Sequence, residues 1–186
     1  MEKKNGDWTI KKTEEKLRND FFAVYQDEVV RPDGKNGEFT TVHFPPGVGV
    51  IALDGEGFVY LVKQFRYVVG RMSLEVIAGS VEDGEEPLAS AKRETREELG
   101  IEAETWTDLG QVDLDTSIVK NVVSLFLAEN LKIGKPESEG TEQIETVKMK
   151  LTEAVEMVMN GEITHSISCG LILKAYQKME NGKPNS

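Results

Sequence analysis

The sequence predicts a mixed α/β (α+β) fold, and three observations carry this prediction. Short β-rich runs bounded by turn residues dominate the first two-thirds of the 186 residues. One amphipathic helix interrupts them at 87–99, and two further helical segments lie near the C-terminus. The length suits one domain with a proper core and an appended segment.

The strands come first along the chain. Runs rich in β-branched and aromatic residues, separated by turn residues, cover 21–25, 28–31, 39–44, 48–53 and 58–62. The last two runs flank a loop that contains two glycines, and therefore predict a β-hairpin. Beyond the first helix, three more strands are expected at 105–112, 122–127 and 145–150. The segment 131–142 is rich in Gly, Pro, Ser and Glu and is expected to be an exposed loop.

The ends of the helices are marked by their flanking residues. Pro87 suits the first position of the helix at 87–99, and Gly100 suits the cap beyond its end. Thr152 and Ser166 are expected to cap the two C-terminal helices. One stripe of the first helix is expected to face the core, and it consists of Leu88, Ala91, Thr95 and Leu99.

Composition excludes several classes of protein. The chain has 22 Lys and Arg against 33 Asp and Glu, a net charge of −11, which disfavours general binding of nucleic acid or anionic membranes. No apolar run approaches the ~20 residues of a membrane helix, and the first residues lack a signal peptide. A single cysteine, Cys169, excludes an internal disulfide and a thiolate metal cluster. We therefore expect a cytoplasmic protein.

The first helix carries a group of glutamates that suggests a metal site. Glu94 and Glu98 are four residues apart and border the buried stripe, with Glu97 further round. Like charges at this spacing cost roughly 0.2–0.5 kcal/mol when exposed, and more near a core. A hard divalent cation would remove this cost, and carboxylate oxygens suit Mg²⁺, Mn²⁺ or Ca²⁺. The alternative is a solvated acidic face with Arg93 pairing locally, which the spacing alone favours.

The residues around this helix resemble a known signature. Segment 79–101 is similar to the Nudix box, a loop-helix-loop motif of 23 residues that ends in Arg-Glu-U-x-Glu-Glu-x-Gly-U, where U is aliphatic. Thr95 stands at the first aliphatic position and is the one departure. The seven fixed positions that agree are Gly79, Glu85, Arg93, Glu94, Glu97, Glu98 and Gly100. Upstream of the box, segments 64–67 and 74–79 resemble the branch of the Nudix family that acts on ADP-ribose and other nucleoside diphosphate sugars. That branch often has proline at the position where this chain has Ile77.

The resemblance implies a fold and a reaction. The fold would be an α/β/α sandwich around a mixed sheet at 46–186, preceded by an N-terminal antiparallel β segment at 1–45 that supports a homodimer. The reaction would be metal-dependent hydrolysis of the diphosphate bond of ADP-ribose or an ADP-, GDP- or UDP-sugar, giving a nucleoside monophosphate and a sugar phosphate. The alternatives are a Nudix hydrolase of nucleoside triphosphates or dinucleoside polyphosphates, and a non-catalytic nucleotide-binding module.

The resemblance also assigns roles within the box. The main ligands of Mg²⁺, or of Mn²⁺, would be Glu94 and Glu98, with Glu97 beside them and the backbone carbonyl of Ala78 as a further ligand. Arg93 would hold a neighbouring carboxylate, Glu85, in place.

A general base is expected outside the box. In this branch of the family the base comes from a glutamate in a loop after the last central strand. The first candidate here is Glu142, which is also a candidate metal ligand, and the second candidate is Glu139. The alternative is an acidic loop with no catalytic part.

Four residues are candidates for binding the substrate. Arg66 would contact a phosphate or the terminal sugar, and Glu75 would anchor sugar hydroxyls or metal. Trp8 and Phe22 would stack on the base, in strands that pack across the homodimer. The alternatives are a cross-strand charge pair for the first two residues and a core or dimer contact for the aromatic ones.

Overall fold

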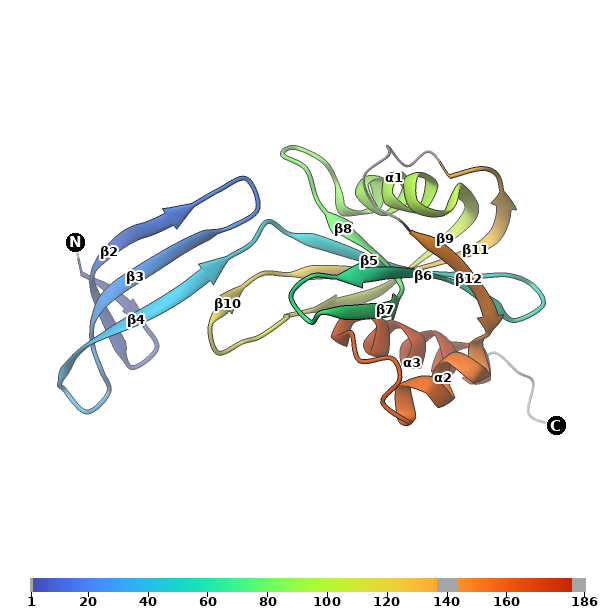
Figure 1. The fold of residues 1–186 in the computed structure, drawn as a ribbon. Helices are drawn as coiled ribbons and strands as arrows, with labels where there is room; N and C mark the ends of the chain where they lie inside the picture. The colour runs from blue at the N-terminus through green and yellow to red at the C-terminus, as the bar shows by residue number, and fades with distance from the viewer. Residues whose placement is uncertain (1, 137–143, 182–186) are drawn as a thin grey trace. The chain divides into compact units, whose positions relative to one another are not determined.

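The computed structural model describes residues 2–136 and 144–181 (Figure 1). The chain divides into two compact units, of which the first spans Met1–Pro46 and Asp113–Val122 and the second spans Gly47–Val112 and Val123–Ser186. The sequence was divided into an N-terminal part at 1–45 and a second part at 46–186. In the structure, Asp113–Val122 belongs to the first unit, although the prediction placed it in the second part. Within the described residues, no helix combines the length and the apolar character needed to cross a bilayer.

The first unit is a single five-stranded sheet. Its strands, in spatial order, are β1 (Lys3–Asn5), β2 (Trp8–Arg18), β3 (Ala23–Val30), β4 (Asn36–His43) and β10 (Val119–Lys120). Neighbours among β1 to β4 are antiparallel, whereas β10 runs parallel to β4. The N-terminal antiparallel β segment is therefore confirmed.

Two details of this sheet differ from the prediction. The runs at 21–25 and 28–31 form one strand, β3, because Gln26 and Asp27 pair with β4 despite being polar. Strand β2 lies in the predicted β segment at 1–45, but no β-rich run indicated it, because most of its side chains are charged and exposed. Its backbone pairing with β3, rather than burial, defines it as a strand.

The second unit contains a seven-stranded mixed sheet. The path runs β12-β6-β5-β11-β9, with β7 paired to β6 and β8 paired to β5. Its strands are β5 (Gly47–Leu53), β6 (Phe58–Arg66), β7 (Arg71–Glu75), β8 (Ile77–Ser80), β9 (Ile101–Val112), β11 (Val123–Ile133) and β12 (Glu145–Lys150). Strands β5 and β11 are parallel and the other pairs antiparallel. The predicted hairpin of β5 and β6 is confirmed, whereas β11 extends three residues into the loop expected at 131–142.

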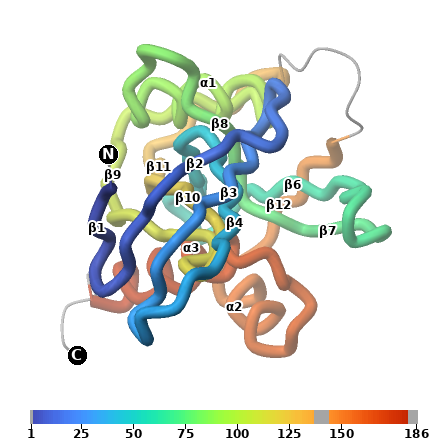
Figure 2. The backbone as a smooth tube through the Cα atoms, turned by 90° about the vertical axis from the view of Figure 1, so that its left-hand side faces the viewer, coloured from blue at the N-terminus to red at the C-terminus, as the bar shows by residue number. Residues whose placement is uncertain are grey.

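Helices cover both faces of this sheet, as Figures 1 and 2 show: α1 (Pro87–Leu99) on one face, α2 (Leu151–Met159) and α3 (Ser166–Asn181) on the other. Side chains of a strand alternate between faces. Accordingly, Val50 of β5 belongs to the core cluster that includes Ala91 of α1, and Ile51 to the cluster that includes Leu171 of α3. The α/β/α sandwich is therefore confirmed.

The helix ends follow most of the predictions. Helix α1 begins at Pro87 and ends at Leu99, and its C-cap residue Gly100 has a left-handed φ of 63°. The prediction that Leu88 belongs to the buried stripe is wrong, because Leu88 is 37% exposed. Ser90 is buried instead, and its hydroxyl donates a hydrogen bond to Glu85. The cap at Thr152 is wrong, because β12 runs straight into α2 with Lys150 at the N-cap.

Candidate active site

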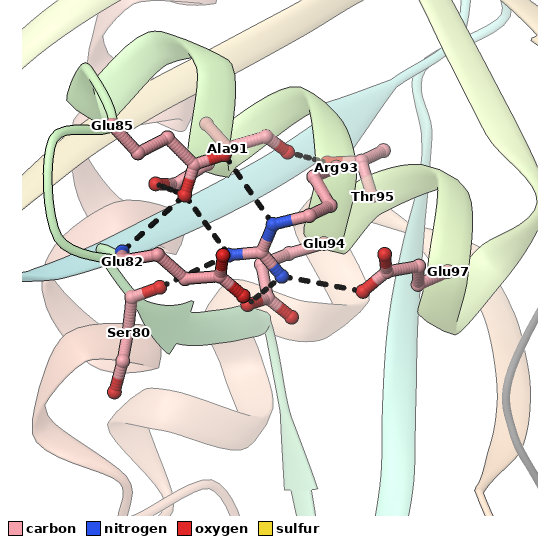
Figure 3. Close-up of polar contacts among 9 residues, drawn as sticks. Ser80, Glu82, Glu85, Ala91, Arg93, Glu94, Thr95 and Glu97 are labelled. Atoms are coloured by element: carbon pink, nitrogen blue, oxygen red, sulfur yellow. Dashed lines mark hydrogen bonds and ion pairs between the residues drawn. The ribbon is translucent and has the colours of Figure 1, made fainter.

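The predicted catalytic residues of α1 gather around the guanidinium of Arg93 (Figure 3). Its Nη1 lies 2.8 Å from Glu94 Oε1 and 3.3 Å from Glu97 Oε2. On its other side Nη2 lies 3.2 Å from Glu85 Oε2 and donates to the carbonyl of Ser80. Arg93 thus ties the helix to the loop before it and to the end of β8.

The pKa values of two carboxyl groups in this site are shifted in opposite directions. Hydrogen bonds from Arg93, and then from Ser90, lower the pKa of Glu85 to about 2. Burial raises the pKa of Glu94, and the attraction of Arg93 does not offset it fully. Charged Glu94 is therefore held in surroundings that disfavour its charge, and a bound cation would relieve that cost.

Replacing Arg93 tests this arrangement. In Arg93→Gln we expect the pKa of Glu85 to rise toward its ordinary value, because the first of its stabilising hydrogen bonds is lost. The folded pKa lies below the unfolded one, so ionised Glu85 contributes stability above pH 4.5 and loses it as pH falls toward about 2. Carboxyl NMR titration measures the shift. Arg18→Gln, in the first unit, is the control, and an unchanged Glu85 titration in Arg93→Gln would contradict the assignment.

Gly79 provides the space that Glu94 occupies. A Cβ built on Gly79 would lie 2.1 Å from Glu94 Cδ and 2.2 Å from its Oε1, far inside contact distance. Gly79 follows Ala78 in β8, the strand whose carbonyl was predicted as a ligand. The Glu94 carboxylate is therefore packed against the backbone of β8, and any side chain at position 79 would displace it.

The donor groups suit a hard divalent cation in chemistry. They are carboxylates and a backbone carbonyl, without thiolate or imidazole. Across residues 2–136 and 144–181, no three His, Cys, Asp or Glu side chains converge as a metal cluster. Arg93 Nη1 donates to one oxygen of Glu94 and to one oxygen of Glu97. Each carboxylate has a second oxygen, so the residues fit a metal in chemistry, and their ligand roles stay a prediction.

Arg66 and Glu75 form an ion pair in the structure. Arg66 Nη2 lies 2.6 Å from Glu75 Oε2, and only 3% of the Glu75 side chain is exposed. Burial alone would raise the pKa of Glu75, but hydrogen bonds from Arg66 and Ser73 outweigh it and lower the pKa. This ion pair is the cross-strand charge pair that was the alternative to a role in binding. It also holds Arg66 in one orientation, and contact of Arg66 with substrate stays a prediction.

Three neighbours of these residues were not found from the sequence. His165 Nδ1 lies 3.5 Å from Glu75 Oε2 and 2.8 Å from Ser168 Oγ, and that hydroxyl accepts from the backbone N–H of Val76. Ser90 contacts Glu85. His165 and Ser168 are about 90 residues away from Glu75 and Val76, and no pattern in the sequence connects them.

The other predicted site residues lie in the first unit or outside the described residues. Trp8 packs edge-on against Phe39 and Phe22 packs against Phe44, each with ring centroids 5.6 Å apart in the first unit. Base stacking by these residues and the homodimer stay predictions. The two candidate general bases, Glu139 and Glu142, lie outside the described residues.

Comparisons with known proteins show which family and which relatives the chain is similar to. Residues 43–165 match the model of the NUDIX domain. The ADP-ribose pyrophosphatase of Bacillus subtilis (strain 168) is 34% identical over 142 residues, or 75% of this chain and 77% of the relative. The ADP-ribose pyrophosphatase of Mycobacterium tuberculosis (strain ATCC 25618 / H37Rv) is 35% identical over 160 residues, 83% of this chain and 76% of the relative.

A solved structure supports the fold. The crystal structure of an ADP compounds hydrolase superposes with a TM-score of 0.82 over 96% of this chain and 97% of that one, at 17% identity. The match to the domain model covers more than half of the chain and includes the whole of the box. The chain therefore belongs to the Nudix family of hydrolases.

Proposed function

We propose that this protein hydrolyses the diphosphate bond of a nucleoside diphosphate sugar with Mg²⁺, and that ADP-ribose is the first candidate substrate. The observation that carries the proposal is the group on α1: Glu94 lies against the backbone of β8, with Arg93 holding Glu94, Glu97 and Glu85 together. The names of the two pyrophosphatases support the choice of substrate.

Charge explains why such an enzyme needs a cation. A diphosphate bridge carries two negative charges near neutral pH, and the chain has a net charge of −11. Nudix enzymes generally use divalent metal ions. Such an ion, held by Glu94, Glu97, Glu98 and the Ala78 carbonyl, would neutralise the charge that develops on the departing phosphate.

The chain's own residues would orient these groups. Arg93 restricts Glu94 and Glu97 to one arrangement, which lowers the entropy cost of binding a cation. Glu75 does the same for Arg66, whose planar guanidinium suits phosphate oxygens or sugar hydroxyls. Glu142, or in second place Glu139, would accept the proton of the attacking water.

A substrate panel tests the proposal. We expect that incubation with Mg²⁺ and ADP-ribose gives AMP and ribose 5-phosphate, identified by mass, and that a chelator stops the reaction. The panel should include ADP-, GDP- and UDP-sugars, nucleoside triphosphates and dinucleoside polyphosphates. Reaction in ¹⁸O water shows which phosphorus is attacked. Preference for a triphosphate or dinucleoside polyphosphate, or no turnover of any compound, would overturn the proposal.

A further inference from the structure

Residues at the start of helix α3 lie against the end of strand β7. His165 directly precedes α3, and its Nδ1 lies 3.5 Å from Glu75 Oε2 and 2.8 Å from Ser168 Oγ. The hydroxyl of Ser168, in the first turn of α3, accepts a hydrogen bond of 2.9 Å from the backbone N–H of Val76. Two consecutive residues, Glu75 and Val76, are therefore held by one helical turn that lies about 90 residues further along the chain.

Burial gives these contacts their effect on Glu75. Only 3% of the Glu75 side chain is exposed, and Ser168 and Val76 are fully buried. Water therefore does not replace a polar contact that is lost here. The carboxylate beside Nδ1 favours the imidazole tautomer with its proton on Nδ1, because that N–H then faces two acceptors. Ser73 holds the carboxylate from within β7, and His165 holds it from the side of α3.

Arg66 takes its orientation from the Glu75 carboxylate. Its Nε donates to both carboxylate oxygens, at 3.1 and 3.2 Å, and its Nη2 donates to Oε2 at 2.6 Å. Glu75 lies opposite Val62 in the hairpin of β6 and β7, so the Arg66 side chain reaches back along β6 to meet it. A long side chain held in this way has lost most of its rotamer freedom before a ligand binds. The exposed part of Arg66, 41% of the side chain, is therefore presented in one orientation.

We propose that His165 is a positioning residue for the substrate: it holds Glu75, which in turn orients Arg66 for contact with a phosphate or sugar group. This inference rests on the proposed function, in which Arg66 binds the substrate. A residue that prepares a binding group strengthens the binding of the ground state and the transition state alike, so its loss raises KM and changes kcat little. Loss of a merely structural residue would lower the amount of folded enzyme and leave KM unchanged.

Kinetics with ADP-ribose and Mg²⁺ tests the proposal. We expect His165→Leu to raise KM roughly tenfold and to change kcat by less than about twofold. His165→Asn should restore most of the affinity, because its amide presents an N–H near the place of Nδ1. The matched control is Thr164→Val: Thr164 lies in the same loop and accepts a hydrogen bond from Arg71 at the other end of β7. This change loosens the loop without touching Glu75, so KM should stay unchanged.

A double-mutant cycle shows whether His165 acts through Arg66. In Arg66→Gln, which lacks the guanidinium, adding His165→Leu should raise KM no further. Additive effects of the two changes would overturn the proposal, as would an unchanged KM in His165→Leu, an equal rise in Thr164→Val, or an His165→Asn variant no better than His165→Leu. Thermal unfolding checks that each variant is folded, and where His165→Leu is unfolded, the smaller change His165→Ala takes its place with the same expectations.

NMR of the arginine side chains separates this inference from the proposed reaction. The Arg66 Nε–H signal, identified by its loss in Arg66→Gln, is recorded with a chelator and without substrate. We expect His165→Leu to speed the exchange of this proton with water several-fold and Thr164→Val to leave it unchanged. Faster exchange together with no turnover of ADP-ribose would support the positioning of Arg66 by His165 and overturn the proposed function. Turnover together with unchanged exchange would support the proposed function and overturn the role of His165.

Discussion

Glu98→Gln should lower kcat for ADP-ribose by at least ~10²-fold, because a neutral amide is a poor ligand for a hard divalent cation and the charge developing in the transition state loses its partner. Glu98 is a half-buried residue in the last turn of α1, with buried Leu99 after it. The change keeps the size of the side chain and removes one negative charge near Glu94. We therefore expect the folded structure to persist.

Three measurements together identify the role of Glu98. Steady-state kinetics gives kcat, calorimetry gives the affinity for Mg²⁺, and thermal unfolding without metal reports stability. The matched control is Glu104→Gln, an exposed glutamate that pairs with Lys132 on β9 and β11, where loss of a surface ion pair matters little. An unchanged kcat in Glu98→Gln would refute the ligand role. An equally large fall in kcat in Glu104→Gln would refute it as well.

Local signals in the sequence predicted the position of α1 well. Pro87 removes an N–H that would have no helical partner, and Gly100 accepts a left-handed φ of 63° that other residues adopt at a cost. Both effects act within one turn of the chain, so no tertiary contact is needed to locate these ends. Strand β5 and the first part of β11, 123–128, were also predictable, because both of their faces are buried and nearly all of their residues are apolar.

Tertiary contacts decided the parts that the sequence did not predict. Strand β2 is polar along most of its length, and only its pairing with β3 makes it a strand. Ser90 has no apolar character, yet it is buried, and its hydroxyl donates a hydrogen bond to Glu85. The contact of His165 with Glu75 depends on how α3 packs on the sheet. Strand pairing and the contact of His165 with Glu75 depend on partners distant in the chain, and the contact of Ser90 with Glu85 depends on how the loop before α1 folds back; periodicity reports none of these.

The candidate site shows the same division. The spacing of Glu94, Glu97 and Glu98 is helical and could be predicted from the sequence, as could the proximity of Arg93 to two of them. The contact of Arg93 with the carbonyl of Ser80 and the position of Glu94 against Gly79 depend on how β8 lies beside α1. The sequence therefore predicted which residues take part, whereas their mutual restraint became visible only in the fold.

Gly79→Ala should lower kcat by at least ~10²-fold, although it adds only a single methyl group. The new Cβ would lie 2.1 Å from Glu94 Cδ, so the carboxylate has to leave its place and the contact of Glu94 with Arg93 has to change. Kinetics with ADP-ribose and Mg²⁺ calorimetry measure the effect, and circular dichroism tests whether the fold persists. Gly170→Ala on α3 is the matched control, because a Cβ there meets no atom within 4 Å and alanine favours a helix.

Full activity in Gly79→Ala would show that Glu94 can act from another position, and the packing of α1 against β8 would then have no part in catalysis. A fall in kcat with an unchanged fold and weaker Mg²⁺ binding would instead tie the function of the box to the absence of one side chain.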